Sequence, residues 1–147
     1  MNAALGYEVK NKNSLRKYVL LAEDDVDDVE FLTVSLQNLD QAIEVRVISS
    51  GDRAISAFES LPDDHLPCLI ILDYNLPALS GYQILTMLAD NERYKHIPKI
   101  IWSTSNSSFF EKECLASGAS AYFVKPADLS GYALLAGKIV EYLGSVH

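Results

Sequence analysis

The segment Cys68–Asp73, with the sequence CLIILD, is a continuous apolar run that ends in a single carboxylate. An unbroken run of this length, without the alternation of a half-exposed strand, is typical of a strand buried on both faces of a parallel sheet. No other run in the chain is as apolar. We therefore expect this segment to be the central strand, with Asp73 at its carboxyl end.

Further short apolar runs stand on both sides of this segment, and a helical pattern follows each run. The expected strands are 18–22, 43–48, 68–72, 99–102 and 121–124. The helix signals are Pro62 as a stop, Ser80 and Ser107 or Ser108 as caps, Gly118 after a helix, and Asp128 as the cap of the last helix. Strict alternation of strands and helices implies parallel strands, because each crossover passes over the sheet with the same hand. The sequence thus predicts an α/β fold, a doubly wound five-stranded parallel sheet with helices on both faces.

The composition is that of one globular domain. The chain has 147 residues, of which 49% are apolar and 22% are charged, enough for one sizeable core. Residues 1–16 are polar and follow neither periodicity, so we interpret them as an N-terminal arm and residues 17–147 as the domain. Cys68 and Cys114 are far apart in sequence, which favours two thiols in a reducing compartment over a disulfide framework.

The formal net charge of −8 limits the classes of partner. An acidic chain repels nucleic acid and anionic lipid, because binding these polyanions depends on Lys and Arg. No apolar stretch approaches the roughly 20 residues that a membrane span requires, and no signal-peptide h-region is present near the start. We therefore expect a cytoplasmic protein without direct nucleic-acid or membrane binding.

Polar groups follow four of the expected strands. Glu23-Asp24 follows the first, Asp73 the third, Ser103 the fourth and Lys125 the fifth. Since the carboxyl ends of parallel strands share one edge of a sheet, these groups are expected in one pocket. Clustered carboxylates need a compensating cation, and Mg²⁺ suits such oxygen ligands. Asp73 beside a metal is then a candidate nucleophile for phosphoryl transfer.

Each of these groups has a simpler interpretation when it is taken alone. Asp27, Asp28 and Glu30 fit the acidic first turn of a helix, where they favour its dipole. Asp73 by itself fits a helix cap, and Lys125 by itself fits a solvated strand end. The coincidence at four separate strand ends is what favours a functional site.

Four motifs resemble those of the receiver domain of two-component response regulators. They are VLLAEDD at 19–25, LIILDYNLP at 69–77, IPKIIWST at 97–104 and GASAYFVKP at 118–126. The resemblance extends over residues 17–143. It implies the flavodoxin-like, receiver type of the doubly wound fold.

The resemblance implies roles for residues around the phosphoryl group. Asp73 matches the aspartate that accepts the group, and Ser103 and Lys125 match the hydroxyl and the ammonium that contact it. Ser103 and the aromatic Tyr122 match the pair that switches on phosphorylation. The resemblance also implies a cis Lys125–Pro126 bond, which few X–Pro bonds adopt.

Mg²⁺ is the cofactor that the resemblance implies. Asp24 matches a direct metal ligand, and Glu23 matches its partner, which acts through water. Asp73 and the backbone carbonyl of Asn75 match the remaining protein ligands. Glu23 stands where many members of the family carry aspartate, a variation that leaves the carboxylate in place.

The implied function is that of a phosphoacceptor response regulator in a two-component phosphorelay. The implied partners are a sensor histidine kinase or a histidine phosphotransfer protein, and a downstream protein target. The chain is not expected to be an enzyme beyond its own phosphorylation and dephosphorylation. Phe109 and Phe110 are adjacent and cannot both face the core, so one of them is a candidate contact for a partner. The alternative is that one packs inward and the other lies flat over a neighbouring residue.

Two alternatives remain from the sequence. A receiver-like adaptor would act without phosphorylation, but such a protein typically lacks Asp73, Asp24 or Lys125, and all three are present. A Mg²⁺-dependent aspartyl-phosphate hydrolase would carry a second acid two residues after the nucleophile. This chain has Asn75 at that position, which weighs against the hydrolase.

Overall fold

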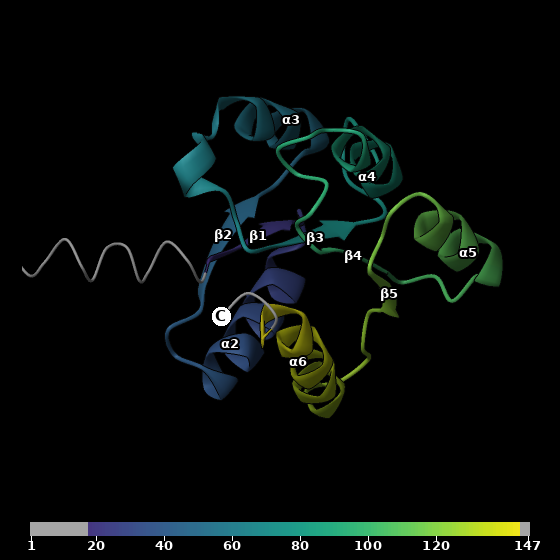
Figure 1. Ribbon diagram of the computed structural model, residues 1–147. Coiled ribbons are helices and arrows are strands. Elements are labelled where there is room, and N and C mark those ends of the chain that lie inside the picture. Colours follow the sequence, from purple (N-terminus) through teal and green to yellow (C-terminus); the bar gives the residue numbers. More distant parts are fainter. Residues whose placement is uncertain (1–17, 145–147) are drawn as a thin grey trace, which may run out of the picture.

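The computed structural model describes residues 18–144, and its five strands form one parallel sheet (Figure 1). The strands are β1 Tyr18–Ala22, β2 Glu44–Ile48, β3 Leu69–Asp73, β4 Lys99–Ser103 and β5 Ala121–Val124. Their order in the sheet is β2-β1-β3-β4-β5, and every neighbouring pair is parallel. The predicted α/β fold is confirmed, with the apolar run as the central strand. The predicted arm, 1–16, lies outside the described residues.

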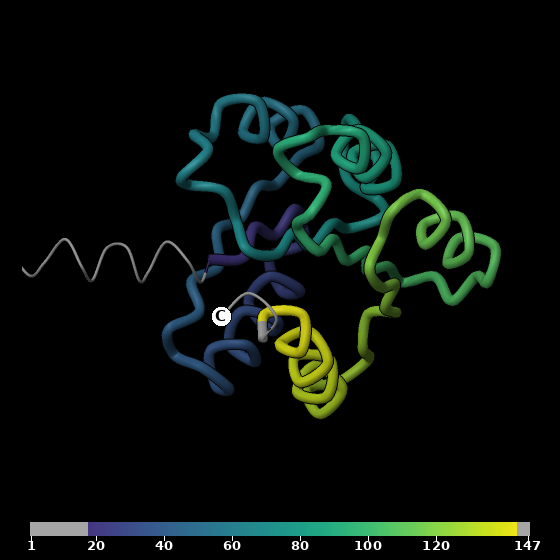
Figure 2. The backbone as a smooth tube through the Cα atoms, viewed as in Figure 1, coloured from purple at the N-terminus to yellow at the C-terminus, as the bar shows by residue number. Residues whose placement is uncertain are grey.

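Helices cover both faces of the sheet, as the alternation predicts. They are α2 Val26–Leu39, α3 Gly51–Ser60, α4 Gly81–Ala89, α5 Ser108–Ala116 and α6 Leu129–Gly144, with a short 3₁₀ turn, η1, at Asp63–His65. Helices α2 and α6 lie together on one face, and α3, α4 and α5 lie on the other (Figures 1 and 2). None of the helices between residues 18 and 144 is long and apolar enough to cross a membrane.

The two faces explain why the strands are continuously apolar. Successive side chains of a strand point to opposite faces, so Val19 and Leu21 pack under α2 and α6, while Leu20 packs under α3 and α4. In β3 every residue is buried, including Asp73. The chain leaves β1 and β3 toward opposite edges of the sheet, so a crevice opens at their carboxyl ends.

The helix ends follow the signals in the sequence. The Ser107 hydroxyl accepts the Phe110 N–H, and the Asp128 carboxylate accepts the Gly131 N–H. Gly118 has φ +114°, the left-handed region that favours glycine after a helix. Ser107 and Asp128, which follow β4 and β5, hold the loops at the carboxyl edge of the sheet at fixed points.

The start of α4 is held by a capping box. The Ser80 hydroxyl accepts the Gln83 N–H, and the Gln83 side chain accepts the Ser80 N–H. We expect Ser80→Ala to lower the free energy of unfolding by about 1 kcal/mol, because it leaves a helix donor without an acceptor. Urea denaturation measures this loss. Ser80→Asp retains an acceptor and should lose much less; equal losses in the two variants would contradict the cap.

Candidate functional site

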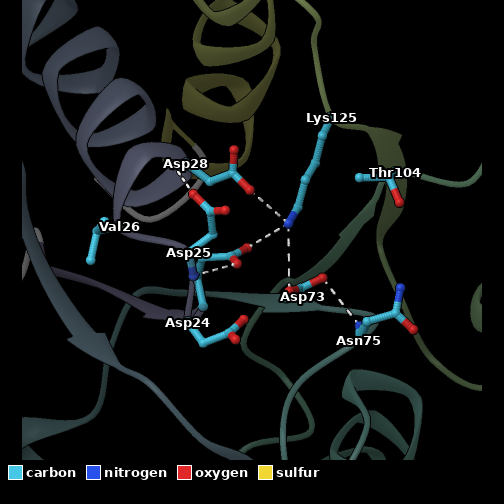
Figure 3. Close-up of a pocket in the computed structure, with 9 residues that line it drawn as sticks. Asp24, Asp25, Val26, Asp28, Asp73, Asn75, Thr104 and Lys125 are labelled. Carbon is cyan, nitrogen blue, oxygen red and sulfur yellow. Dashed lines mark hydrogen bonds and ion pairs between the residues drawn. The ribbon is translucent and has the colours of Figure 1, made fainter.

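Three carboxylates meet at the carboxyl ends of β1 and β3. Ala22 is in register with Leu72, so the residues that follow them, Glu23 and Asp73, lie level at the edge of the sheet. Carboxylate oxygens of Glu23, Asp24 and Asp73 lie within 4.8 Å of one another (Figure 3). Glu23 and Asp73 are 1% and 4% exposed, while Asp24 is exposed. The cluster therefore lies at the boundary between the core and an open pocket.

Lys125 brings a positive charge to this cluster from the end of β5. Its backbone N–H donates to the Ser103 carbonyl at 2.7 Å, which anchors the loop. Its Nζ lies 2.9 Å from Glu23 Oε1, 2.9 Å from Asp28 Oδ2 and 3.5 Å from Asp73 Oδ2 (Figure 3). Burial acts to lower the pKa of Lys125, but the contacts with these carboxylates outweigh burial and raise it above its ordinary value. The ammonium is therefore a fixed positive charge beside Asp73.

The carboxylates outnumber this cation. Burial raises the pKa of Glu23 to about 7, and the ion pair with Lys125 offsets only part of this effect. Glu23 Oε1 is buried and faces Lys125 Nζ at 2.9 Å, and Glu23 Oε2 accepts the Asp25 N–H at 3.1 Å. The Asn75 N–H donates to Asp73 Oδ1 at 3.1 Å, which turns the other Asp73 oxygen toward Lys125. A cluster of oxygen donors with excess negative charge fits a hard divalent cation such as Mg²⁺.

The pocket brings together most of the residues that the sequence predicts for a site. It is lined by Glu23, Asp24, Asp25, Val26, Asp28, Asp73, Asn75, Thr104 and Lys125. All four predicted metal-site residues and Lys125 are among them. Ser103 is not: it is fully buried, and the neighbouring Thr104 lines the pocket instead.

Ser103 and Tyr122, the expected switch pair, converge on one residue of the loop after β4. The Ser103 hydroxyl accepts the Ser105 N–H at 3.0 Å. The Tyr122 hydroxyl donates to the Ser105 carbonyl at 2.8 Å, and its ring is turned inward and largely buried. Ser105 thus connects the two side chains directly.

Asp28 lies in the acidic first turn of α2, as the sequence predicts, but it is also a pocket residue, which the sequence interpretation missed. Its carboxylate contacts both Lys125 Nζ and the Tyr132 hydroxyl. Asp28 stands three residues after the N-cap of α2, Asp25. Side chains in the first turn of a helix tilt toward its N-terminus, and here that end faces the pocket. The position of Asp28 in the first turn of α2 was therefore the feature from which its place in the pocket could have been predicted.

The expected cis bond is wrong. No cis peptide bond is present among the described residues, so the Lys125–Pro126 bond is trans. The trans form of an X–Pro bond is favoured by about 0.5–1 kcal/mol before any tertiary contact acts. The trans loop still delivers the Lys125 ammonium to the carboxylates.

Comparison with known proteins agrees with this arrangement. Residues 19–133 match the family model of the response regulator receiver domain. The chain belongs to this receiver family. The matched segment runs from β1 into α6 and contains every residue that lines the pocket.

Relatives of known sequence or structure resemble the receiver over most of its length. The two-component response regulator ORR5 of Oryza sativa subsp. japonica is 29% identical over 124 residues, which is 84% of this chain and 89% of the relative. The crystal structure of the phosphorylated cyanobacterial phytochrome response regulator RcpA has a TM-score of 0.80 and 26% identity, covering 89% of this chain and 96% of that one. The crystal structure of the response regulator RPA3017, in red light signaling of R. palustris, has a TM-score of 0.75 and 27% identity, covering 85% of this chain and 92% of that one.

The two adjacent phenylalanines of the receiver separate as the sequence predicts. Phe109 is 66% exposed at the start of α5. Phe110 is partly buried and stacks on Tyr74, with ring centroids 4.7 Å apart and planes 18° apart. Tyr74 directly follows Asp73, so the first turn of α5 packs against the residue next to the pocket.

Proposed function

We propose that this receiver accepts a phosphoryl group on Asp73 and passes the signal on through protein contacts. The observation that carries the proposal is the placement of Asp73. Its carboxylate is buried at the edge of the pocket, within 4.8 Å of two further carboxylates and 3.5 Å from Lys125 Nζ. One nucleophile, one fixed cation and a set of metal-compatible oxygens are the groups that phosphoryl transfer requires.

The proposed reaction takes the phosphoryl group from a phosphohistidine. An oxygen of Asp73 attacks phosphorus in line with the P–N bond, so that an O–P bond forms as the P–N bond breaks. The electron pair of the broken bond returns to the imidazole nitrogen of the donor, which is protonated. Lys125, already 3.5 Å from Asp73 Oδ2, binds an oxygen of the transferred group.

The chain offers Glu23, Asp24, Asp73 and Asn75 to hold Mg²⁺ at this pocket. Bound there, Mg²⁺ would neutralise the charge on the phosphoryl oxygens. Ser103 is buried in this structure and bonded to Ser105, so it reaches the phosphoryl group only if that loop moves. In the proposal this movement also shifts Tyr122, which is bonded to the same residue.

The proposed partners follow from the chemistry and the family. The phosphoryl donor is a sensor histidine kinase or a histidine phosphotransfer protein, and the receptor of the signal is a protein that contacts α5, where Phe109 is exposed. The net charge of −8 argues against a nucleic acid in that role. The chain acts as an enzyme only on its own phosphoryl group. Cys68 and Cys114 form no disulfide, which suits a cytoplasmic location.

Intact-mass measurement after incubation with Mg²⁺ and a small acyl-phosphate donor tests the proposal. We expect the mass to increase by one phosphoryl group. No increase, together with no Mg²⁺ binding, would favour the adaptor that acts without phosphorylation. No increase with rapid release of inorganic phosphate would favour the aspartyl-phosphate hydrolase.

Metal removal should suppress this reaction. With a chelator in place of Mg²⁺, we expect phosphorylation to slow by about 100-fold, because the crowded carboxylates would repel the incoming phosphoryl group. The rate is obtained from intact masses over time. Excess Mg²⁺ restores the rate if the loss is specific, whereas an unchanged rate under chelation would show that no metal takes part.

A further inference from the structure

Asp28 connects Lys125 to helix α6 through both of its carboxylate oxygens. Oδ2 accepts a hydrogen bond from Lys125 Nζ at 2.9 Å, and Oδ1 accepts one from the Tyr132 hydroxyl at 2.8 Å. Tyr132 is 3% exposed and stands edge-on to the Trp102 ring. Because Tyr132 is fixed by this packing, the position of the Asp28 carboxylate is fixed as well.

The Lys125 ammonium is held from several sides in this arrangement. Nζ lies 4.9 Å from the centroid of the Trp102 ring, where the negative face of the indole attracts a cation. Asp28 approaches it from helix α2, while Asp73 approaches it from the end of β3 (Figure 3). Glu23, which follows β1, is the third carboxylate in contact with it. Nζ is closer to Asp28 than to Asp73, at 2.9 Å against 3.5 Å.

We propose that Asp28 is a positioning residue that holds Lys125 back from Asp73 and so sets how strongly this ammonium competes with a metal and pairs with a phosphoryl group. This inference rests on the proposed function. The ammonium is already 2.9 Å from Glu23 Oε1, and once released by Asp28 it would also pair closely with Asp73, now 3.5 Å away. Asp28 thereby keeps the Asp73 carboxylate, one of the oxygen donors that a metal needs, available to the metal.

The hydrogen bond between Asp28 and Lys125 should have the opposite effect on a phosphoryl group, whose binding it weakens. To bind a phosphoryl oxygen, Lys125 must give up part of its hydrogen bond with Asp28. Asp28 also keeps a negative charge near the group that arrives on Asp73. Loss of Asp28 should therefore weaken Mg²⁺ binding and strengthen binding of a phosphoryl analogue, whereas general damage to the pocket would weaken both.

The experiment measures both affinities on the full chain. Fluorescence of Trp102, the single tryptophan, follows Mg²⁺ titration, and trifluoroberyllate serves as the phosphoryl analogue at saturating Mg²⁺. We expect Asp28→Asn to weaken Mg²⁺ binding by about fivefold and to tighten trifluoroberyllate binding by about fivefold, the scale of one hydrogen bond that is weakened and not fully lost. Asp27→Asn removes the same charge at the exposed neighbouring position and should change neither affinity by more than about twofold.

The variant Lys125→Met distinguishes an effect of Asp28 that acts through Lys125 from a direct effect of the Asp28 charge. In Lys125→Met no ammonium is left for Asp28 to hold, so adding Asp28→Asn should change Mg²⁺ affinity by less than about twofold. The proposal would be overturned if Asp28→Asn lowered the Mg²⁺ affinity equally with and without Lys125. It would also be overturned if Asp28→Asn alone weakened the binding of both Mg²⁺ and trifluoroberyllate. Failure of the proposed function is a separate result: the unsubstituted chain would then bind neither Mg²⁺ nor trifluoroberyllate.

Discussion

Asp73→Asn is expected to abolish phosphorylation and to leave the fold intact. The amide has the shape of the carboxylate but lacks its nucleophilic oxygen, so the rate of phosphorylation by an acyl-phosphate donor should fall by at least about a thousandfold. The Asn75 N–H that now donates to Asp73 Oδ1 retains an acceptor in the amide oxygen. Intact mass with and without the substitution measures the effect.

The stability of this variant provides an internal check. Asp73 shares Lys125 with Glu23 and Asp28, so removing one of these negative charges relieves repulsion in a buried cluster. We expect the urea midpoint of Asp73→Asn to be equal to or higher than that of the unsubstituted chain. Asp27→Asn, at an exposed position, should be phosphorylated normally. Robust labelling of Asp73→Asn would show that another residue accepts the phosphoryl group.

Gly81→Ala is expected to destabilise the fold and to disturb the pocket at the same time. A Cβ at position 81 would lie 2.2 Å from the Asp73 carbonyl oxygen and 2.9 Å from its carbonyl carbon. Both are backbone atoms of the central strand, so no side-chain rotation removes the overlap. The Gly81 N–H also donates to the Tyr74 carbonyl at 3.0 Å. We expect a loss of about 3 kcal/mol in the free energy of unfolding.

Urea denaturation measures this loss, and the chain offers a matched control. Gly137 lies inside α6, and a Cβ there would meet nothing within 4 Å. Gly137→Ala should therefore stabilise the protein by about 0.5–1 kcal/mol, through the higher helix propensity of alanine. We also expect slower phosphorylation of Gly81→Ala, because the strand end that carries Asp73 has to move. Similar stability of the two variants would contradict the close approach.

The sequence by itself determined the order of the elements and the edge at which the site lies. The run Cys68–Asp73 could be interpreted correctly because a strand covered on both faces needs apolar residues at nearly every position. Such a run can be recognised in the sequence of the segment itself. Ser80, Ser107 and Asp128 cap helices through bonds to residues three positions away, so their roles are also local. Strand boundaries agreed with prediction or differed from it by one residue, as with β2, which begins at Glu44.

The pocket was predicted from the parallel arrangement of the strands, and local sequence patterns alone would not have predicted it. Once the strands are parallel, their carboxyl ends share one edge, and Glu23, Asp24, Asp73 and Lys125 must lie near one another. The structure places all four around one pocket. The chemical role of each residue came from the family resemblance, because spacing along the chain does not distinguish a phosphoacceptor from a helix cap.

Only the tertiary structure decided which side chains share the Lys125 ammonium. Asp28 and Tyr132 are separated by 104 positions in sequence, and their contact depends on how α2 and α6 pack side by side on the sheet. Ala78 adopts φ +74° in the loop after β3, a conformation that alanine does not favour; the neighbouring Pro77 carbonyl accepts the Gly51 N–H from across the fold. Such contacts depend on the packing angles between elements that are distant in sequence, and these angles cannot be predicted from local sequence patterns.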